Sequence, residues 1–432
     1  MSPGRTGGTH VAAKDAQAAQ LEPNVERVEA DLAELGTIGR LADGGLARLA
    51  WTEEEFAAKE FLISRLGAIG LRADMDEAAN VWCEVGPASG PALVIGSHLD
   101  TVPSGGGYDG ALGVMAALEV MRLLVESGRT LSRRVRLVAF TDEEGARFGT
   151  GLFGSTVVAG LADAAHLGAV RDNAGVSLEE AMRARGFRIS ALSDATRRLE
   201  DIAAYLELHI EQGPRLERMG RDVGLVTAIT GIHQMRYTFE GEANHAGTTA
   251  LEDRRDALLP AAETILAVRR AAADTDGSAV ATVGYVQAHP GAANVVPGRA
   301  ALSVEVRSPD AAVMADVHRA IAQKAEEAAE RDKVSVHLAE AHLAAPAAMD
   351  AAWRERMRRT ARDIGEQAVD LVSWAGHDAG AMAMRLPAAM VFVPSRRGIS
   401  HAPDEYTAPE RYRAGLTVYA RTVAAWAFGL VD

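Results

Sequence analysis

The stretch ALVIGSHLDTVPSGGGYDG (residues 92–110) decides the fold class of this chain. Its first four residues form a continuous apolar run, which predicts a buried strand. The apolar sequence from Gly110 to Glu126, closed by Gly128, predicts a helix, and residues 135–140 form the next predicted strand. This alternation predicts an α/β domain with a mostly parallel sheet and helices on both faces. Functional sites in such domains lie beyond the carboxyl ends of the strands.

The sequence pattern changes between residues 214 and 342. This region has predicted helices at residues 253–270 and 311–330, and predicted strands at residues 223–230, 235–240, 279–286, 301–307 and 334–338. The order is typical of an α+β domain with a ferredoxin-like, split βαβ arrangement on an antiparallel sheet. We therefore predict a second domain at residues 214–342.

The remaining segments complete the domain plan. The second domain is inserted into the first, which would comprise residues 23–213 and 343–432. Residues 1–22 are rich in Gly, Ala, Thr and Gln and predict a disordered tail.

The composition excludes several classes of partner. The chain has 45 Lys and Arg residues against 59 Asp and Glu residues, and the resulting net charge of -14 repels the phosphates of nucleic acids. No apolar run is long enough to span a bilayer, and the first residues lack the apolar core of a signal peptide. The single cysteine, Cys83, rules out an internal disulfide. We expect a cytoplasmic protein with neither nucleic acid nor a membrane as partner.

Residues that can bind metal follow the first predicted strand. His98 comes at its end, and Asp100, two residues on, points to the same side, where a carboxylate can accept an imidazole N–H. Asp109 follows in a glycine-rich loop whose flexible backbone lets a short carboxylate reach inward. A single pair of this kind is more often structural than metal-binding.

Acidic residues follow the next predicted strand, in the segment TDEEG (residues 141–145). Burying three like charges costs several kcal/mol unless a cation neutralises them, or unless they remain solvated. Neighbouring carboxylates such as Glu143 and Glu144 can have different roles, since one can bind a metal while the other acts as a general base.

Two further histidines lie within or after other predicted strands. In YLELHIEQG (residues 205–213) strict alternation puts His209 on the face opposite Leu206, Leu208 and Ile210, and His401 follows the strand predicted at residues 390–393. Each histidine alone is commonly a polar or capping residue. Four strand ends that together offer His, Asp, Glu, His and His indicate a metal site.

The sequence resembles the peptidase M20 superfamily, and specifically its branch of amidases, hydantoinases and carbamoylases. This branch includes N-carbamoyl-L-amino acid hydrolases, β-ureidopropionases and allantoate amidohydrolases. The resemblance covers nearly the whole chain from about Asn24 onward, and its motifs are GSHLDTVPSGGGYDG, FTDEEGARFG, LELHIEQGP, GEANHAGTT, NVVPG, GHDAGAMA and GISHAPDEY.

The resemblance implies two divalent metal ions per subunit. One would be held by His98, Asp109 and His209, and the other by Asp109, Glu144 and His401. We expect Zn²⁺, with Mn²⁺, Co²⁺ and Ni²⁺ as alternatives for a set of nitrogen and oxygen ligands. The resemblance makes Glu143 the general base and Asp100 a further catalytic residue.

The resemblance also implies a set of substrate-binding residues, which are Gln212, His245, Asn294, Arg307 and His377. The second domain would be a dimerisation lid, and His245 would reach the active site from the partner subunit of a homodimer. His245 and His377 would stabilise the oxyanion. Arg307 alternates away from an apolar face and could bind a carboxylate with two bonds, although a surface arginine is the alternative.

The expected activity is hydrolysis of the C–N bond of N-carbamoyl-L-amino acids or related ureido acids by a hydroxide that bridges the metals. Allantoate amidohydrolase is the main alternative. Peptidases or deacylases of the superfamily are less favoured, because many of its peptidases have a carboxylate where this chain has His209. A non-catalytic relative is less favoured because the ligand set and Glu143 are intact.

Overall fold

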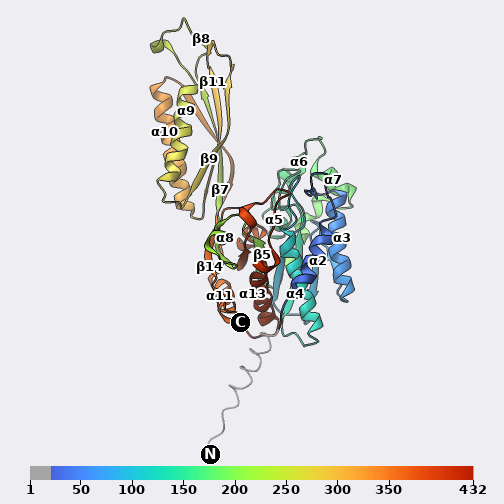
Figure 1. Cartoon of the computed structure of the whole chain (residues 1–432). Helices are drawn as coiled ribbons and strands as arrows, with labels where there is room; N and C mark the ends of the chain where they lie inside the picture. The colour runs from blue at the N-terminus through green and yellow to red at the C-terminus, as the bar shows by residue number, and fades with distance from the viewer. Residues whose placement is uncertain (1–20, 432) are drawn as a thin grey trace, which may run out of the picture. The chain divides into compact units, whose positions relative to one another are not determined.

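The computed structural model describes residues 21–431. The chain forms two compact units, of which the first runs to Thr227 and resumes at Met349, and the second is Ala228–Ala348 (Figure 1). The tail predicted at residues 1–22 lies outside the described residues except for its last two positions. Within residues 21–431, every helix is too short or too polar to span a lipid bilayer.

The larger sheet has nine strands. They are β1 (Ala73–Met75), β2 (Val81–Val85), β3 (Ala92–His98), β4 (Arg134–Phe140), β5 (Ile202–Ile210), β6 (Gly224–Ile229), β13 (Ala347–Ala348), β14 (Val369–Ser373) and β15 (Ala388–Val393). The four central strands, β4, β3, β5 and β15, are parallel. Antiparallel strands extend the sheet on both sides, with β2 and β1 beyond β4, and β6 and β13 beyond β15. The predicted α/β class with a parallel centre is confirmed, and the antiparallel flanks are an addition to it.

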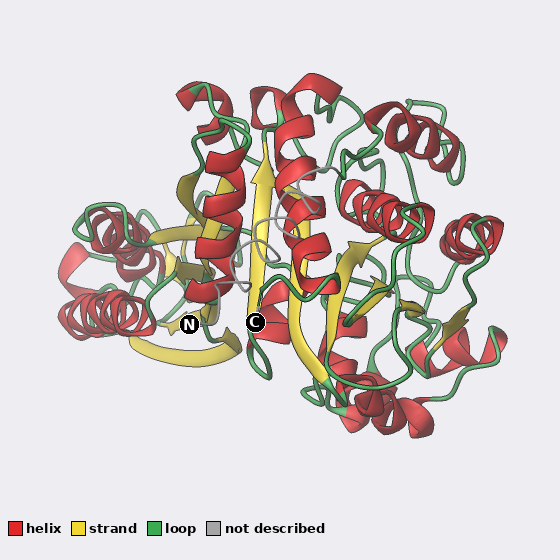
Figure 2. Cartoon of the chain, turned by 90° about the horizontal axis from the view of Figure 1, so that it is seen from below, coloured by secondary structure: helices red, strands yellow, loops and turns green. Residues whose placement is uncertain are grey.

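Helices surround this sheet (Figure 2). One apolar core joins alternate strand residues to α2 (Val25–Leu35), α3 (Glu53–Ala68), α4 (Ala111–Glu126), α11 (Ala351–Asp363) and α13 (Pro409–Ala427). The short helices α5 (Phe153–Val158) and α12 (Asp378–Ala383) pack against the sheet through β4, β5 and β15. Further short helices are α6 (Ala164–Ala169), α7 (Leu178–Ala184), α8 (Arg215–Met219) and the 3-10 helices η1 (Ile189–Leu199) and η3 (Arg396–Gly398).

The second unit is built on an antiparallel sheet with the strand order β12-β7-β11-β9. Its strands are β7 (Gly231–Glu240), β9 (Val280–His289), β11 (Arg299–Ser308) and β12 (Ser335–Ala344), and its helices are α9 (Leu258–Ala273) and α10 (Ala311–Arg331). A ribbon of β8 (Asn244–His245) and β10 (Val295–Val296) continues beyond β7 and β11. This chain order confirms the predicted ferredoxin-like arrangement.

Two predicted elements differ from the structure. Residues 223–230, whose pattern places them in the inserted domain, form β6 in the larger sheet, where Leu225 pairs with Val391 of β15. The helix expected from Asp253 begins at Leu258, because residues 251–253 form a separate 3-10 turn (η2) and the Asp256 carboxylate accepts the Leu258 N–H. Apolar alternation identifies a strand but not the sheet that it joins.

The close packing of α4 on β5 depends on Gly113. A Cβ at this position would lie 2.3 Å from the Leu208 carbonyl oxygen and 2.8 Å from Ser97 Cβ. We expect Gly113→Ala to lower the free energy of unfolding by about 1–3 kcal/mol, as overpacking does. Gly67→Ala is the matched control, since this exposed glycine of α3 has nothing within 4 Å of its Cβ position. A denaturant titration measures both variants, and Gly67→Ala should raise the free energy of unfolding by about 0.5–1 kcal/mol. Equal effects of the two variants would contradict the close packing of α4 on β5.

Candidate metal centre

The candidate site lies at the carboxyl ends of the parallel strands. His98 is the last residue of β3, and His209 is the last but one of β5. The loop after β4 carries Glu143 and Glu144, and the loop after β15 carries His401. Asp109 lies two residues before α4. Because parallel strands end at the same edge of a sheet, these residues meet there although they are far apart in sequence. The structure thus brings together all the predicted metal ligands.

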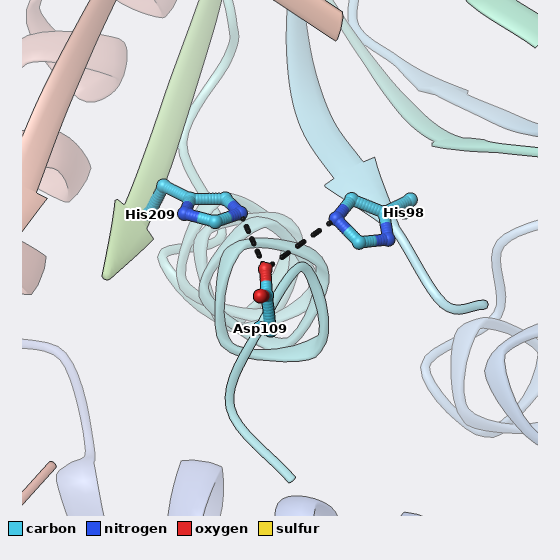
Figure 3. A group of neighbouring side chains, drawn as sticks. All are labelled: His98, Asp109 and His209. Atoms are coloured by element: carbon cyan, nitrogen blue, oxygen red, sulfur yellow. Dashed lines mark ion pairs between the residues drawn. The ribbon is translucent and has the colours of Figure 1, made fainter. Parts of the chain in front are cut away.

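His98, Asp109 and His209 form the first group of possible ligands (Figure 3). Asp109 Oδ1 lies 3.1 Å from His209 Nε2 and 3.7 Å from His98 Nε2. All three side chains are buried. Gly110 makes this approach possible, because its φ is 63° and a Cβ there would lie 2.4 Å from the His98 ring.

Asp109, Glu144 and His401 form the second group. His401 Nε2 lies 3.2 Å from Asp109 Oδ2 and 3.4 Å from Glu144 Oε2. The His401 side chain is 47% exposed, whereas the two carboxylates are nearly buried. Each oxygen of Asp109 therefore faces a different partner, and Asp109 belongs to both groups.

The donor set fits divalent metal ions. In a tetrahedral zinc site with bonds of about 2.0–2.1 Å, neighbouring ligand atoms lie about 3.3 Å apart. The N···O separations in the two groups, from 3.1 to 3.7 Å, are close to that spacing. Within each group all ligand atoms lie within 4.8 Å of one another. Each group could hold one ion, with Asp109 shared between them.

The carboxylates of the site depend on nearby positive charge. Burial opposes the ionisation of Asp109, but hydrogen bonds with His209 and His401 outweigh it and hold the pKa of Asp109 well below its usual range. The hydrogen bond with Asp109 raises the pKa of His401 to about 9, and burial raises the pKa of Glu144 to about 7. A divalent cation would supply the same positive charge that the imidazoles supply when protonated.

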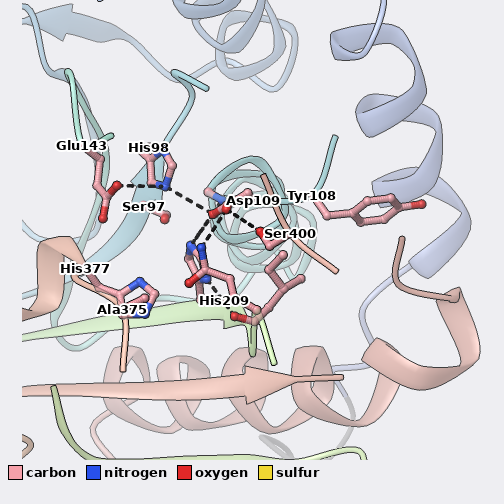
Figure 4. A network of polar contacts seen from close by, with 12 residues as sticks. Ser97, His98, Tyr108, Asp109, Glu143, His209, Ala375, His377 and Ser400 are labelled. Carbon is pink, nitrogen blue, oxygen red and sulfur yellow. Dashed lines mark hydrogen bonds and ion pairs between the residues drawn. The ribbon is translucent and has the colours of Figure 1, made fainter. Parts of the chain in front are cut away.

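Glu143 lies beside the first group, with Oε2 3.8 Å from His98 Nε2 (Figure 4). Burial raises the pKa of Glu143 well above its usual value; His98 opposes this shift and Glu144 adds to it. A carboxylate with a raised pKa can take up and release a proton near neutral pH. This position and environment suit a general base.

Asp100 holds the loop that carries Glu143. Its carboxylate accepts the backbone N–H groups of Glu143 and Glu144 at 3.2 and 3.1 Å. Its Oδ1 also faces His98 Nδ1 at 3.6 Å, while its backbone oxygen lies closer to that nitrogen, at 3.2 Å. Asp100 therefore orients both a possible metal ligand and the possible general base.

Gln212 and His377 lie next to the two groups. Gln212 Nε2 donates to Asp109 Oδ2 at 2.8 Å, and within residues 21–431 its buried Oε1 has no hydrogen-bond partner. The His377 ring lies 4.5 Å from the His209 ring, centroid to centroid, and its Nε2 is 2.9 Å from Ser373 Oγ. Burial and the neighbouring His209 hold the pKa of His377 well below its usual value, so this imidazole is neutral.

The other three predicted substrate residues belong to the second unit. His245 and Asn294 are neighbours in the ribbon of β8 and β10, where the Ala246 N–H donates to the Asn294 carbonyl. Arg307 is the last residue but one of β11 and pairs with Glu305 at 2.7 Å. β11 has ten residues and so extends roughly 30 Å, and the ribbon lies beyond its first residue. The structure therefore separates Arg307 from His245 and Asn294 within one chain.

Sequence reasoning assigned no role to Ser400 or Glu405, although both belong to the quoted motif GISHAPDEY. Glu405 Oε1 accepts the backbone N–H groups of Tyr108 and Asp109 at 2.8 and 3.0 Å. Ser400 Oγ lies 2.8 Å from Asp109 Oδ2 and 2.7 Å from Glu405 Oε2. These contacts join the loop of Asp109 to the loop of His401. The acidic residue four positions after His401 was the only signal for them in the sequence.

The sequence and the fold are similar to those of known hydrolases. The sequence matches peptidase family M20/M25/M40 over residues 94–425, and the chain belongs to this family. It is 38% identical over 403 residues to N-carbamoyl-L-amino acid amidohydrolase of Geobacillus stearothermophilus, which covers 92% of this chain and 97% of that protein. It is 35% identical over 384 residues to allantoate amidohydrolase of Bacillus subtilis, with 88% and 93% covered.

The structural comparison leads to the same branch. The crystal structure of an amidase of the hydantoinase/carbamoylase family from Burkholderia multivorans has a TM-score of 0.84 and 33% identity, with 94% of this chain and 98% of that chain covered. The expected family branch is thereby confirmed. The chain is a hydrolase that acts on non-peptide C–N bonds.

Proposed function

We propose that the protein hydrolyses the C–N bond of N-carbamoyl-L-amino acids with two divalent metal ions, of which Zn²⁺ suits the ligands best. The observation that carries this proposal is the shared position of Asp109, whose two oxygens face two separate groups of ligands with Glu143 beside them. A relative that is 38% identical and named for this activity supports the choice of substrate.

The proposed mechanism assigns one task to each residue. His98, Asp109 and His209 would hold one ion, and Asp109, Glu144 and His401 the other; such ions polarise a carbonyl and lower the pKa of a bound water. Glu143 takes a proton from the attacking water and returns it to the leaving nitrogen. His377, which is neutral, donates a hydrogen bond to the oxyanion as it forms.

Gln212 provides a contact that suits a carbamoyl group. Its buried Oε1, which lacks a partner among the described residues, can accept a hydrogen bond from the terminal NH₂ of the substrate. An acceptor left unpaired inside a site favours ligands that bring a donor. This contact supports a ureido substrate over a simple N-acyl amino acid.

Allantoate is the second candidate substrate, because a relative named allantoate amidohydrolase is 35% identical over most of the chain. Release of ammonia by metal-loaded protein should be compared for N-carbamoyl-L-amino acids, N-carbamoyl-β-alanine and allantoate, each with a chelator-treated control. We expect turnover of N-carbamoyl-L-amino acids that the chelator abolishes. Turnover of allantoate alone would select the second candidate, and no turnover of any compound by metal-loaded protein would refute the proposed activity.

We also propose that the active enzyme is a homodimer in which His245 and Asn294 serve the partner's site. Arg307 lies at the opposite end of β11 from these two residues, and the length of the strand exceeds that of any small ureido acid. All three can touch one substrate only if Arg307 comes from one subunit and His245 and Asn294 come from the other. A monomeric mass in solution with full activity would contradict this arrangement.

Arg307 is proposed to bind the substrate carboxylate. Loss of a charged hydrogen bond worth about 1.5–3 kcal/mol should make Arg307→Ala raise KM roughly 10- to 100-fold, with a much smaller effect on kcat. Steady-state kinetics with an N-carbamoyl-L-amino acid measures this effect. Arg236→Ala in β7 of the same sheet is the control and should leave KM unchanged. An unchanged KM in the Arg307 variant would remove its assigned role.

A further inference from the structure

Glu207 is a fully buried carboxylate to which neither the sequence motifs nor the proposed mechanism gives a role. It lies in β5 two residues before His209, so both side chains project from the same face of the strand. Its surroundings therefore bear on how the candidate metal centre is built.

The two oxygens of Glu207 bind two different neighbours. Oε1 accepts a hydrogen bond from Ser97 Oγ at 2.7 Å, and Oε2 accepts the backbone N–H of Ala379 at 3.1 Å. Ser97 directly precedes His98 at the end of β3, and Ala379 lies in the first turn of α12, two residues after His377. One carboxylate thus joins the three elements that carry His98, His209 and His377, which lie close together in Figure 4.

Packing alone does not account for an acidic residue at this position. Among the described residues no lysine or arginine forms an ion pair with Glu207. Burial raises the pKa of Glu207, and Glu207 in turn adds to the effect of burial in raising the pKa of the nearby buried Asp378. A buried charge of this kind is costly, and an apolar side chain of similar size is often at least as stable. The carboxylate is better explained by what its two hydrogen bonds hold in place.

We propose that Glu207 is a positioning residue of the hydrolase site, which fixes the spacing of His98, His209 and His377 through its hydrogen bonds to Ser97 and Ala379. The part of this inference that concerns metal binding rests on the proposed function, in which His98 and His209 are ligands. Groups that orient metal ligands typically change metal affinity about 10- to 100-fold when removed.

The first measurement is a Zn²⁺ titration of the full-length, metal-free protein by calorimetry. We expect Glu207→Ala to raise the Kd of Zn²⁺ about 10- to 100-fold, and Ser97→Ala, which removes only one of the two bonds, to have an intermediate effect. Glu207→Gln should recover most of the affinity, because its amide oxygen can accept from Ala379 while its NH₂ donates to the Ser97 hydroxyl.

Glu119→Gln is the matched control. Glu119 is also a fully buried carboxylate, but it lies in α4 and binds the Asn24 N–H and the Arg27 guanidinium. This variant should lower the melting temperature and leave the Kd of Zn²⁺ unchanged. Folded Glu207→Ala and Ser97→Ala proteins with the Kd of the wild type would overturn the proposal.

A second measurement separates this inference from the proposed function. Imidazole ¹H–¹⁵N spectra of histidine-labelled, metal-free protein report on the three rings without any metal. We expect the signals of His98, His209 and His377 to shift in Ser97→Ala and Glu207→Ala but not in Glu119→Gln. If wild-type protein bound no Zn²⁺ while these signals shifted, the metal mechanism would fail and the positioning role would stand. Unshifted signals would refute the positioning role.

Discussion

Glu143→Gln is expected to lower kcat by about 10²- to 10⁴-fold, because the amide cannot take a proton from the attacking water. KM should change little, since Glu143 is proposed to act on the reacting atoms and not on the substrate carboxylate. The variant should also keep both metal ions, because Glu143 belongs to neither group of ligands. Steady-state kinetics and metal analysis of the same preparation measure the three quantities.

Glu144→Gln is the informative comparison for this prediction. The two residues are adjacent in sequence, but only Glu144 faces His401 and Asp109 in the second group. We expect Glu144→Gln to lose affinity for one ion, whereas Glu143→Gln retains both. Loss of metal from Glu143→Gln, or a kcat close to that of the wild type, would show that the two roles are wrongly divided.

Asp109→Asn is expected to abolish activity and to weaken the binding of both ions. The asparagine side chain is neutral and offers a single carbonyl oxygen, so it cannot serve His209 on one side and His401 on the other as Asp109 does. His401→Ala should instead weaken one site only, because His401 lies in the second group. Metal content after dialysis against a defined free Zn²⁺ concentration measures both effects.

A different outcome would revise the bridging role of Asp109. If Asp109→Asn lost only one ion, the two groups would not share this residue in the metal-bound protein. Asp43→Asn is a suitable control, because this exposed carboxylate also lies in a loop of the first unit and hydrogen-bonds to a serine. It should retain both ions and full activity.

The sequence predicted much of the candidate site because the ligands follow strands that can be recognised from their apolar residues. His98 follows the apolar run at residues 92–95 and ends β3, and alternation alone puts His209 on the side opposite Leu208. The convergence of these ends follows from the parallel order of β4, β3, β5 and β15. The assignment of particular residues to two ions came from the family resemblance and not from spacing.

Contacts that involve the backbone could not be predicted from the sequence. Glu405 accepts two main-chain N–H groups of the loop of Asp109, and Asp100 accepts two from the loop of Glu143. Such bonds depend on the conformation of the loop, and no periodic pattern in the sequence predicts a loop conformation. The membership of β6 in the larger sheet was missed for a related reason, because its apolar residues fit either sheet.

Anomalous diffraction from crystals grown with Zn²⁺ tests most directly whether two metal ions share Asp109. We expect two anomalous peaks above the zinc edge, one among His98, Asp109 and His209 and the other among Asp109, Glu144 and His401. Glu207, His209 and His377 form a third group of possible ligands, which the proposed mechanism leaves without metal. A peak in that third group, or a single peak that Asp109 does not contact, would contradict the binding of two ions by Asp109.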